Sequence, residues 1–123
     1  MSVPHYSLFI DGEWVDSPEH YEIRSPATGE LVATVAKGST QHIDQAVAAA
    51  KAAHASGVWR SKAPEERADL LNAVAARLAE RADELAVLQT RENGATIRVT
   101  STLHLGLSIG QLQYLAGLAK SYE

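Results

Sequence analysis

Five histidines are the side chains of this sequence best suited to chemistry, because imidazole binds metals and transfers protons near neutral pH. Two metal ligands on one helix have to lie three or four residues apart. His42 and His54 are too far apart for that, and His104 has no histidine or carboxylate at that spacing. His5 and His20 lie near predicted turns. We therefore interpret all five as solvated or packed side chains.

Other catalytic groupings also have structural explanations. The acid pairs Glu65–Glu66 and Asp83–Glu84 lie at predicted helix starts, where carboxylates stabilise the helix dipole. The glycine-rich segment Gly106–Gly110 lies inside a helical pattern, whereas a dinucleotide-binding loop follows a strand and opens a helix. The chain has no cysteine, which excludes thiol nucleophiles and thiolate metal sites. The residues alone thus indicate no catalytic group and no cofactor-binding residue.

Composition narrows the class of protein. The 123 residues are 46% hydrophobic and 21% charged, which is typical of one globular domain. The net charge is −4 and the basic residues are scattered singly, so we expect no nucleic-acid partner. No stretch approaches the roughly 18 apolar residues of a membrane span, and the N-terminus lacks a secretory pattern. We expect a cytoplasmic protein without a membrane partner.

The first third of the chain reads as short strands. Leu8–Ile10 and Trp14–Val15 flank Asp11–Gly12, a pair that supplies the positive φ angles of a type I′ hairpin turn. Tyr21–Arg24 and Leu31–Val35 are alternating or β-branched, and Pro-Ala-Thr-Gly turn chemistry lies between them. Two β-hairpins joined by turns are predicted, with no helical crossover.

The rest of the chain has helical periodicity. Ser39 or Thr40 is expected to cap an alanine-rich, closely packed helix that Gly57 ends. The next helix opens at Pro64 and should break near 81–83, where Asp83 is a candidate cap.

The last helical stretch carries three glycines near one face, which indicates close approach of a partner surface: Gly106, Gly110 and Gly117. The fold class is therefore an α+β arrangement, two short N-terminal β-hairpins followed by three to four helices. The expected ranges are 8–36 for the hairpins and 39–56, 64–93 and 96–122 for the helices.

Five short motifs, in this order and spacing, resemble the opening of the NAD(P)-dependent aldehyde dehydrogenase family, and Tyr114–Gly117 extends the resemblance. The motifs are Phe9–Val15, Ser25–Glu30, Val47–Ala53, Pro64–Arg67 and Glu92–Gly94. Many members have Lys-Pro where this chain has Ala95–Thr96, and asparagine where it has Ser25. These departures suggest a divergent subgroup and leave the preferred aldehyde open.

The resemblance implies that residues 1–123 are the N-terminal part of the cofactor-binding domain of the α/β aldehyde dehydrogenase fold. The Rossmann core and the catalytic domain, with its cysteine nucleophile and glutamate base, would be absent from this chain. The complete enzyme would bind NAD or NADP, act on an aldehyde and form a homo-oligomer, whereas this chain alone would bind no cofactor.

The resemblance also implies two kinds of site residue. Leu103 and Leu107 match positions that line the substrate tunnel in relatives, although apolar stripes on helices are as often plain core leucines. Relatives hold a structural monovalent cation through backbone carbonyls that match Ile23 and Glu92. Carbonyl ligation is nearly independent of the side chain, so the sequence neither supports nor excludes this metal site.

Two functions follow. The first is an N-terminal fragment of an oxidoreductase that oxidises an aldehyde to a carboxylic acid with NAD(P), inactive as this chain alone. The alternative is a non-catalytic helical interaction or oligomerisation module derived from that family. The chain ends on an apolar helix without a capping glycine after it, which favours the fragment. Under either hypothesis the apolar helix face predicts self-association.

Overall fold

The computed structural model describes residues 3–121, so the predicted helix end at 122 lies outside the described residues. The chain forms two compact units, Met1–Arg60 and Ser61–Glu123. The first holds all described strands and one helix, and the second is helical. The predicted order of hairpins followed by helices is confirmed.

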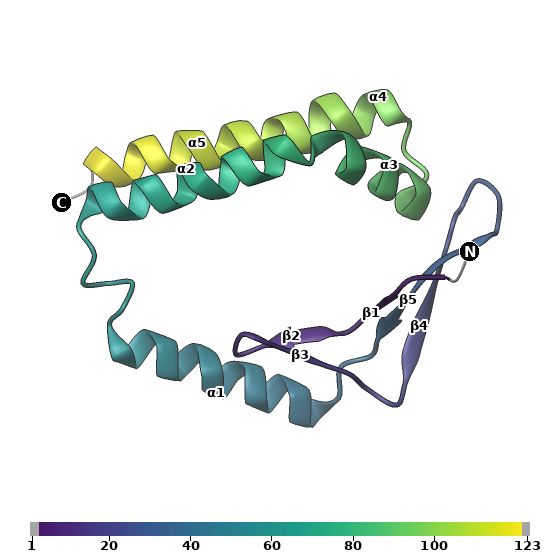
Figure 1. The fold of residues 1–123 in the computed structure, drawn as a ribbon, viewed down its shortest axis with the longest axis horizontal. Helices are drawn as coiled ribbons and strands as arrows, with labels where there is room; N and C mark the ends of the chain where they lie inside the picture. The colour runs from purple at the N-terminus through teal and green to yellow at the C-terminus, as the bar shows by residue number, and fades with distance from the viewer. Residues whose placement is uncertain (1–2, 122–123) are drawn as a thin grey trace. The chain divides into compact units, whose positions relative to one another are not determined.

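The first unit contains a three-stranded sheet with the strand order β1 (His5–Tyr6), β5 (Leu31–Ala36), β4 (His20–Arg24) (Figure 1). The central strand β5 pairs antiparallel with β4 and parallel with β1. The β4–β5 hairpin was predicted, whereas β1 was not, because its two residues are too few to show a strand pattern. The unit's buried hydrophobic side chains lie on β5, where Val32, Ala33 and Ala36 are at most 4% exposed.

The other predicted hairpin, which comes earlier in the chain, joins β2 (Leu8–Ile10) to β3 (Glu13–Val15). Its turn has positive φ at both central residues, 55° at Asp11 and 84° at Gly12, as a type I′ turn requires. Phe9 lies opposite Trp14 with ring centroids 4.9 Å apart. The predicted turn is confirmed.

Helix α1 (Thr40–Ser56) follows the sheet and contacts β2. Ser39 caps it, since its hydroxyl accepts from the His42 amide at 3.4 Å, and Gly57 ends it at φ 73°. Both predicted ends are confirmed. The expected close packing of this helix is not confirmed, because α1 has no buried residue and Ile43 is exposed. Its alanines are small, but within the described chain little packs over them.

In the second unit, helices α2 (Pro64–Glu80) and α3 (Ala82–Asn93) are separated at Arg81. Arg81 leaves helical geometry at φ −111° and ψ 13°, which confirms the predicted break. The predicted cap at Asp83 is wrong, because that residue lies in the first turn of α3 and Arg81 occupies the cap position without a side-chain bond. The Arg81 guanidinium instead pairs with Glu84 at 2.7 Å.

The last helical stretch contains a widened turn. It runs through α4 (Ile97–Val99), a π-helical segment η1 (Thr100–Leu105) and α5 (Gly106–Ser121). Thr100 is fully buried, and its hydroxyl lies 2.9 Å from the hydroxyl of Thr90 on α3. This hydrogen bond connects the π-helical turn to α3.

Helices α2 and α5 lie side by side along their lengths (Figure 1). Alanines mediate the contact, since Ala68, Ala75 and Ala116 are at most 1% exposed. Within the described chain no other element approaches Gly110 or Gly117, where a Cβ would meet nothing within 4 Å, and a Cβ at Gly106 would meet only the Ser101 carbonyl oxygen of the adjoining η1 at 3.6 Å. None of the helices in residues 3–121 has both the length and the apolar character needed to span a membrane.

Candidate functional site

The two predicted tunnel leucines lie on the surface of the second unit. Leu103 in η1 is 52% exposed and Leu107 in α5 is 57% exposed, so neither is a core leucine within the described chain. On α5, Leu107, Tyr114 and Leu118 recur at helical spacing and all are exposed. We call these three residues the α5 apolar face. The tunnel role of Leu103 and Leu107 stays a prediction.

The two predicted cation-binding positions belong to different units. Ile23 lies in β4 of the first unit, half-buried and opposite Ala33, and Glu92 lies exposed in α3 of the second. The cation site at these two carbonyls stays a prediction.

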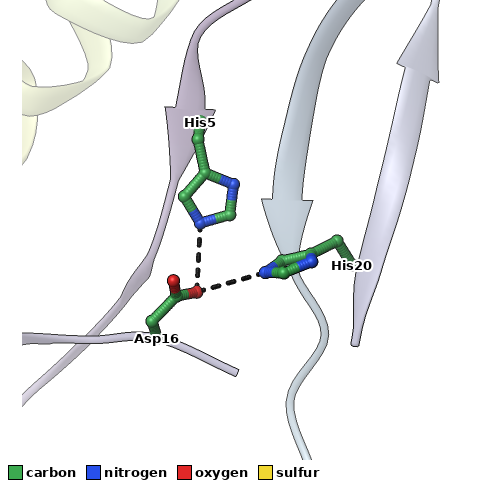
Figure 2. A group of neighbouring side chains, drawn as sticks. All are labelled: His5, Asp16 and His20. Atoms are coloured by element: carbon green, nitrogen blue, oxygen red, sulfur yellow. Dashed lines mark hydrogen bonds and ion pairs between the residues drawn. The ribbon is translucent and has the colours of Figure 1, made fainter. Parts of the chain in front are cut away.

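A group of three polar side chains comes together in the first unit, as Figure 2 shows. His5 extends from β1, His20 is the first residue of β4, and Asp16 follows β3. Both imidazoles direct Nε2 at the same oxygen, Oδ1 of Asp16, at 3.0 Å from His5 and 3.3 Å from His20. The two rings meet edge to face with centroids 4.7 Å apart.

The surroundings of the cluster fix its geometry. The Ser17 amide donates to the same Asp16 oxygen at 2.8 Å, and Nδ1 of His5 lies 2.9 Å from the Thr34 hydroxyl on β5. The Ser17 amide, and after it the hydrogen bond from His5, holds the pKa of Asp16 below its ordinary value. The three side chains stay partly open to solvent.

This cluster is not among the sites predicted from the sequence. His5 and His20 were interpreted singly, since they lie 15 residues apart and neither falls on a helix. Their approach depends on β1 pairing with β5, where His5 lies opposite Thr34, and on His20 lying opposite Ala36. The available signal was Asp16 four residues before His20, flanking the start of a predicted strand.

The glycine-rich segment Gly106–Gly110 is helical and does not have the form of a dinucleotide-binding loop. Gly106 has helical angles of φ −59° and ψ −45°, and Gly110 lies well inside α5. A phosphate loop instead leaves amides free ahead of a helix. The segment therefore lacks the backbone geometry of such a loop.

Comparison with known proteins decides the family. A sequence profile described as the aldehyde dehydrogenase family matches residues 14–123. The chain belongs to the aldehyde dehydrogenase family. This confirms the resemblance of its motifs to the family's N-terminal segment.

Two curated relatives illustrate the match. The cytosolic 10-formyltetrahydrofolate dehydrogenase of Xenopus laevis is 34% identical over 119 residues, which cover 95% of this chain and 13% of that protein. The putative aldehyde dehydrogenase DhaS of Bacillus subtilis (strain 168) is 36% identical over 112 residues, 89% of this chain and 23% of that protein. This aldehyde dehydrogenase chain thus spans less than a quarter of either relative.

Solved structures show the same fold. An NAD-dependent aldehyde dehydrogenase from Sinorhizobium meliloti superposes with a TM-score of 0.92 at 30% identity, covering 99% of this chain and 25% of that one. A betaine aldehyde dehydrogenase mutant from Staphylococcus aureus, solved in complex with NAD⁺, gives 0.90 at 30% identity, covering 94% and 24%. The strands and helices described above are therefore part of the α/β aldehyde dehydrogenase fold.

Proposed function

We propose that this chain is the N-terminal scaffold of an oxidoreductase that oxidises an aldehyde to a carboxylic acid with NAD or NADP. The family match over residues 14–123 carries this proposal. The NAD⁺ complex of a structural relative supports nicotinamide use by the complete enzyme.

The chain would contribute structure and no reacting group. In the family's chemistry a cysteine is the nucleophile toward the aldehyde and a glutamate activates water, and NAD(P), when bound, would supply the capacity to take up the hydride that leaves the aldehyde carbon. These 123 residues hold no cysteine, so the nucleophile has to come from other protein segments. The chain by itself is then inactive and binds no cofactor.

The α5 apolar face supports a scaffold role. Leu107, Tyr114 and Leu118 are exposed, and Gly110 beside them leaves open space where another backbone can approach. Exposed apolar side chains gathered on one helix face favour burial against further protein. We propose that other segments of the enzyme cover this face, with Leu103 and Leu107 reaching the substrate passage and the whole enzyme assembling as a homo-oligomer.

Cofactor binding and mass test this proposal together. The native protein is captured with antibodies against residues 3–121, its intact mass is measured, and it is titrated with NAD⁺ and NADP⁺ by calorimetry beside the isolated 123-residue chain. We expect a protein several times heavier than the chain that binds one nucleotide per subunit, and no binding by the isolated chain. A native protein of the short mass that binds no nucleotide would reject the proposal.

The second candidate function is a non-catalytic interaction or oligomerisation module. The exposure of the α5 apolar face favours it as well, because such a face can join two copies of the chain. Light scattering after size-exclusion chromatography tests it, with Leu107→Glu and Leu118→Glu compared with Ala76→Glu on an exposed position of α2. A defined oligomer of the native protein that only the α5 substitutions dissociate would favour this module.

A further inference from the structure

We propose that His5, Asp16 and His20 bind a divalent transition-metal ion of the Zn²⁺ type. Nε2 of each imidazole and one carboxylate oxygen of Asp16 would be the ligands. All three donor atoms already lie within 4.8 Å of one another in the first unit. The proposal is independent of the aldehyde chemistry above.

Two of the three distances between donor atoms lie near those of a tetrahedral ion, and the third is at most 4.8 Å. With bonds of about 2.0–2.2 Å to nitrogen and oxygen, two neighbouring ligands of Zn²⁺ lie roughly 3.3–3.6 Å apart. The two distances to Asp16 Oδ1 are 3.0 Å from His5 and 3.3 Å from His20 (Figure 2). Small side-chain rotations would therefore admit the ion between donors that already converge.

The three donor atoms suit a metal ion that is intermediate between hard and soft. Neutral imidazole is a good ligand for Zn²⁺, Cu²⁺ and Ni²⁺, and two imidazoles with one carboxylate leave at least one position for water. The single carboxylate offsets half of the ion's charge, which favours moderate and reversible binding. The partial exposure of all three side chains gives the ion a path from solvent.

A second layer of contacts prepares the site. Ligand imidazoles usually donate their other N–H to an oxygen, which fixes the ring and its tautomer. Nδ1 of His5 lies 2.9 Å from the Thr34 hydroxyl on the central strand, and the Ser17 amide steadies Asp16 at 2.8 Å. With Nε2 on the metal, the Nδ1–H of His5 donates to Thr34.

The bound ion would link three parts of the first unit. Strand β1 pairs with β5 through only two residues, His5 and Tyr6. The ion would join this short strand to the segment after β3 and to the start of β4. Because the three ligands converge only in the folded chain, metal binding would stabilise the first unit by mass action.

Calorimetric titration of the metal-free chain with ZnCl₂ tests the proposal. The chain should bind one equivalent, and His5→Ala and His20→Ala should each weaken binding by at least about 10-fold, as should Asp16→Asn. Thr34→Val should weaken Zn²⁺ binding by roughly 10-fold, because it removes the hydroxyl that accepts a hydrogen bond from Nδ1 of His5. His54→Ala is the control, since His54 is exposed in the last turn of α1 and should bind as the unaltered chain does.

Titration with Co²⁺ adds a spectroscopic readout, because tetrahedral nitrogen and oxygen ligation gives strong visible absorption that octahedral aqueous Co²⁺ lacks. Circular dichroism checks that each variant is folded. If His5→Ala unfolds the chain, Asp16→Asn and Thr34→Val decide the matter, and unchanged affinity in both would overturn the site. The absence of saturable Zn²⁺ binding by the unaltered chain, or equal loss in His54→Ala, would overturn it too.

Discussion

Replacing Thr100 by valine is expected to lower the free energy of unfolding of the second unit by about 1–2 kcal/mol. Thr100 is fully buried in η1, and its hydroxyl donates to the Ile97 carbonyl at 3.0 Å. Because the Thr100 hydroxyl has only this one hydrogen to donate, it accepts in its bond with the Thr90 hydroxyl, which lies 2.9 Å away and is the donor. Valine has nearly the same shape and the same β-branch but accepts no hydrogen bond.

The magnitude follows from what the substitution leaves behind. The Thr90 hydroxyl loses its acceptor in a half-buried position, and an unsatisfied buried polar group costs about 1–3 kcal/mol. The valine methyl gains some apolar burial, which offsets part of that cost. Thr102→Val is the matched control, because Thr102 is exposed and bonds only the Arg98 carbonyl, so water can replace the contact.

Urea denaturation followed by far-ultraviolet circular dichroism measures both variants. Thr102→Val should stay within about 0.5 kcal/mol of the unaltered chain, as surface substitutions usually do. The double variant Thr90→Val/Thr100→Val should lose less than the sum of the two single losses, since Thr100→Val leaves the Thr90 hydroxyl without its acceptor and the double variant has no hydroxyl at position 90. Additive losses, or equal effects at Thr100 and Thr102, would refute this account of the widened turn.

Two further predictions concern the packed alanines and the carboxylate of the cluster. Ala75→Leu, at a 1% exposed position between α2 and α5, should lower the free energy of unfolding of the second unit by about 1–3 kcal/mol. Ala76→Leu, at the neighbouring exposed position, should leave that free energy nearly unchanged, and chemical denaturation measures both variants. Because the pKa of Asp16 is lowered in the folded chain, its ionised form favours folding at pH values above the unfolded pKa of about 3.9. That advantage over Asp16→Asn should vanish as pH falls from there through the lower folded pKa, as tryptophan-detected unfolding in a metal chelator would show.

Elements with strong local signals could be predicted from the sequence. Asp11–Gly12 gave the hairpin turn, Ser39 and Gly57 gave both ends of α1, and Pro64 gave the start of α2. Each of these depends on the backbone preference of one or two residues, which a single sequence displays. The break at Arg81 could be predicted for a different reason, since one uninterrupted helix over 64–93 would be unusually long.

Features set by tertiary contact could not be predicted in this way. Strand β1 exists because β5 lies beside it, and two residues carry no periodicity of their own. The π-helical turn at Thr100 depends on packing against α3, which local propensity does not register. The histidine cluster could not be predicted for the same reason, because His5 reaches Asp16 only when β1 pairs with β5 in this register.

The rate of NAD(P)H formation by the native protein tests the central claim most directly. The protein captured through residues 3–121 is supplied with NAD⁺ or NADP⁺ and a panel of small aldehydes, and absorbance of the reduced nicotinamide is followed beside the isolated chain. We predict aldehyde-dependent reduction by the native protein, with a carboxylic acid formed in equal amount, and no turnover by the isolated chain. Turnover by the isolated chain, or a native protein inert toward every aldehyde with either nucleotide, would contradict the account.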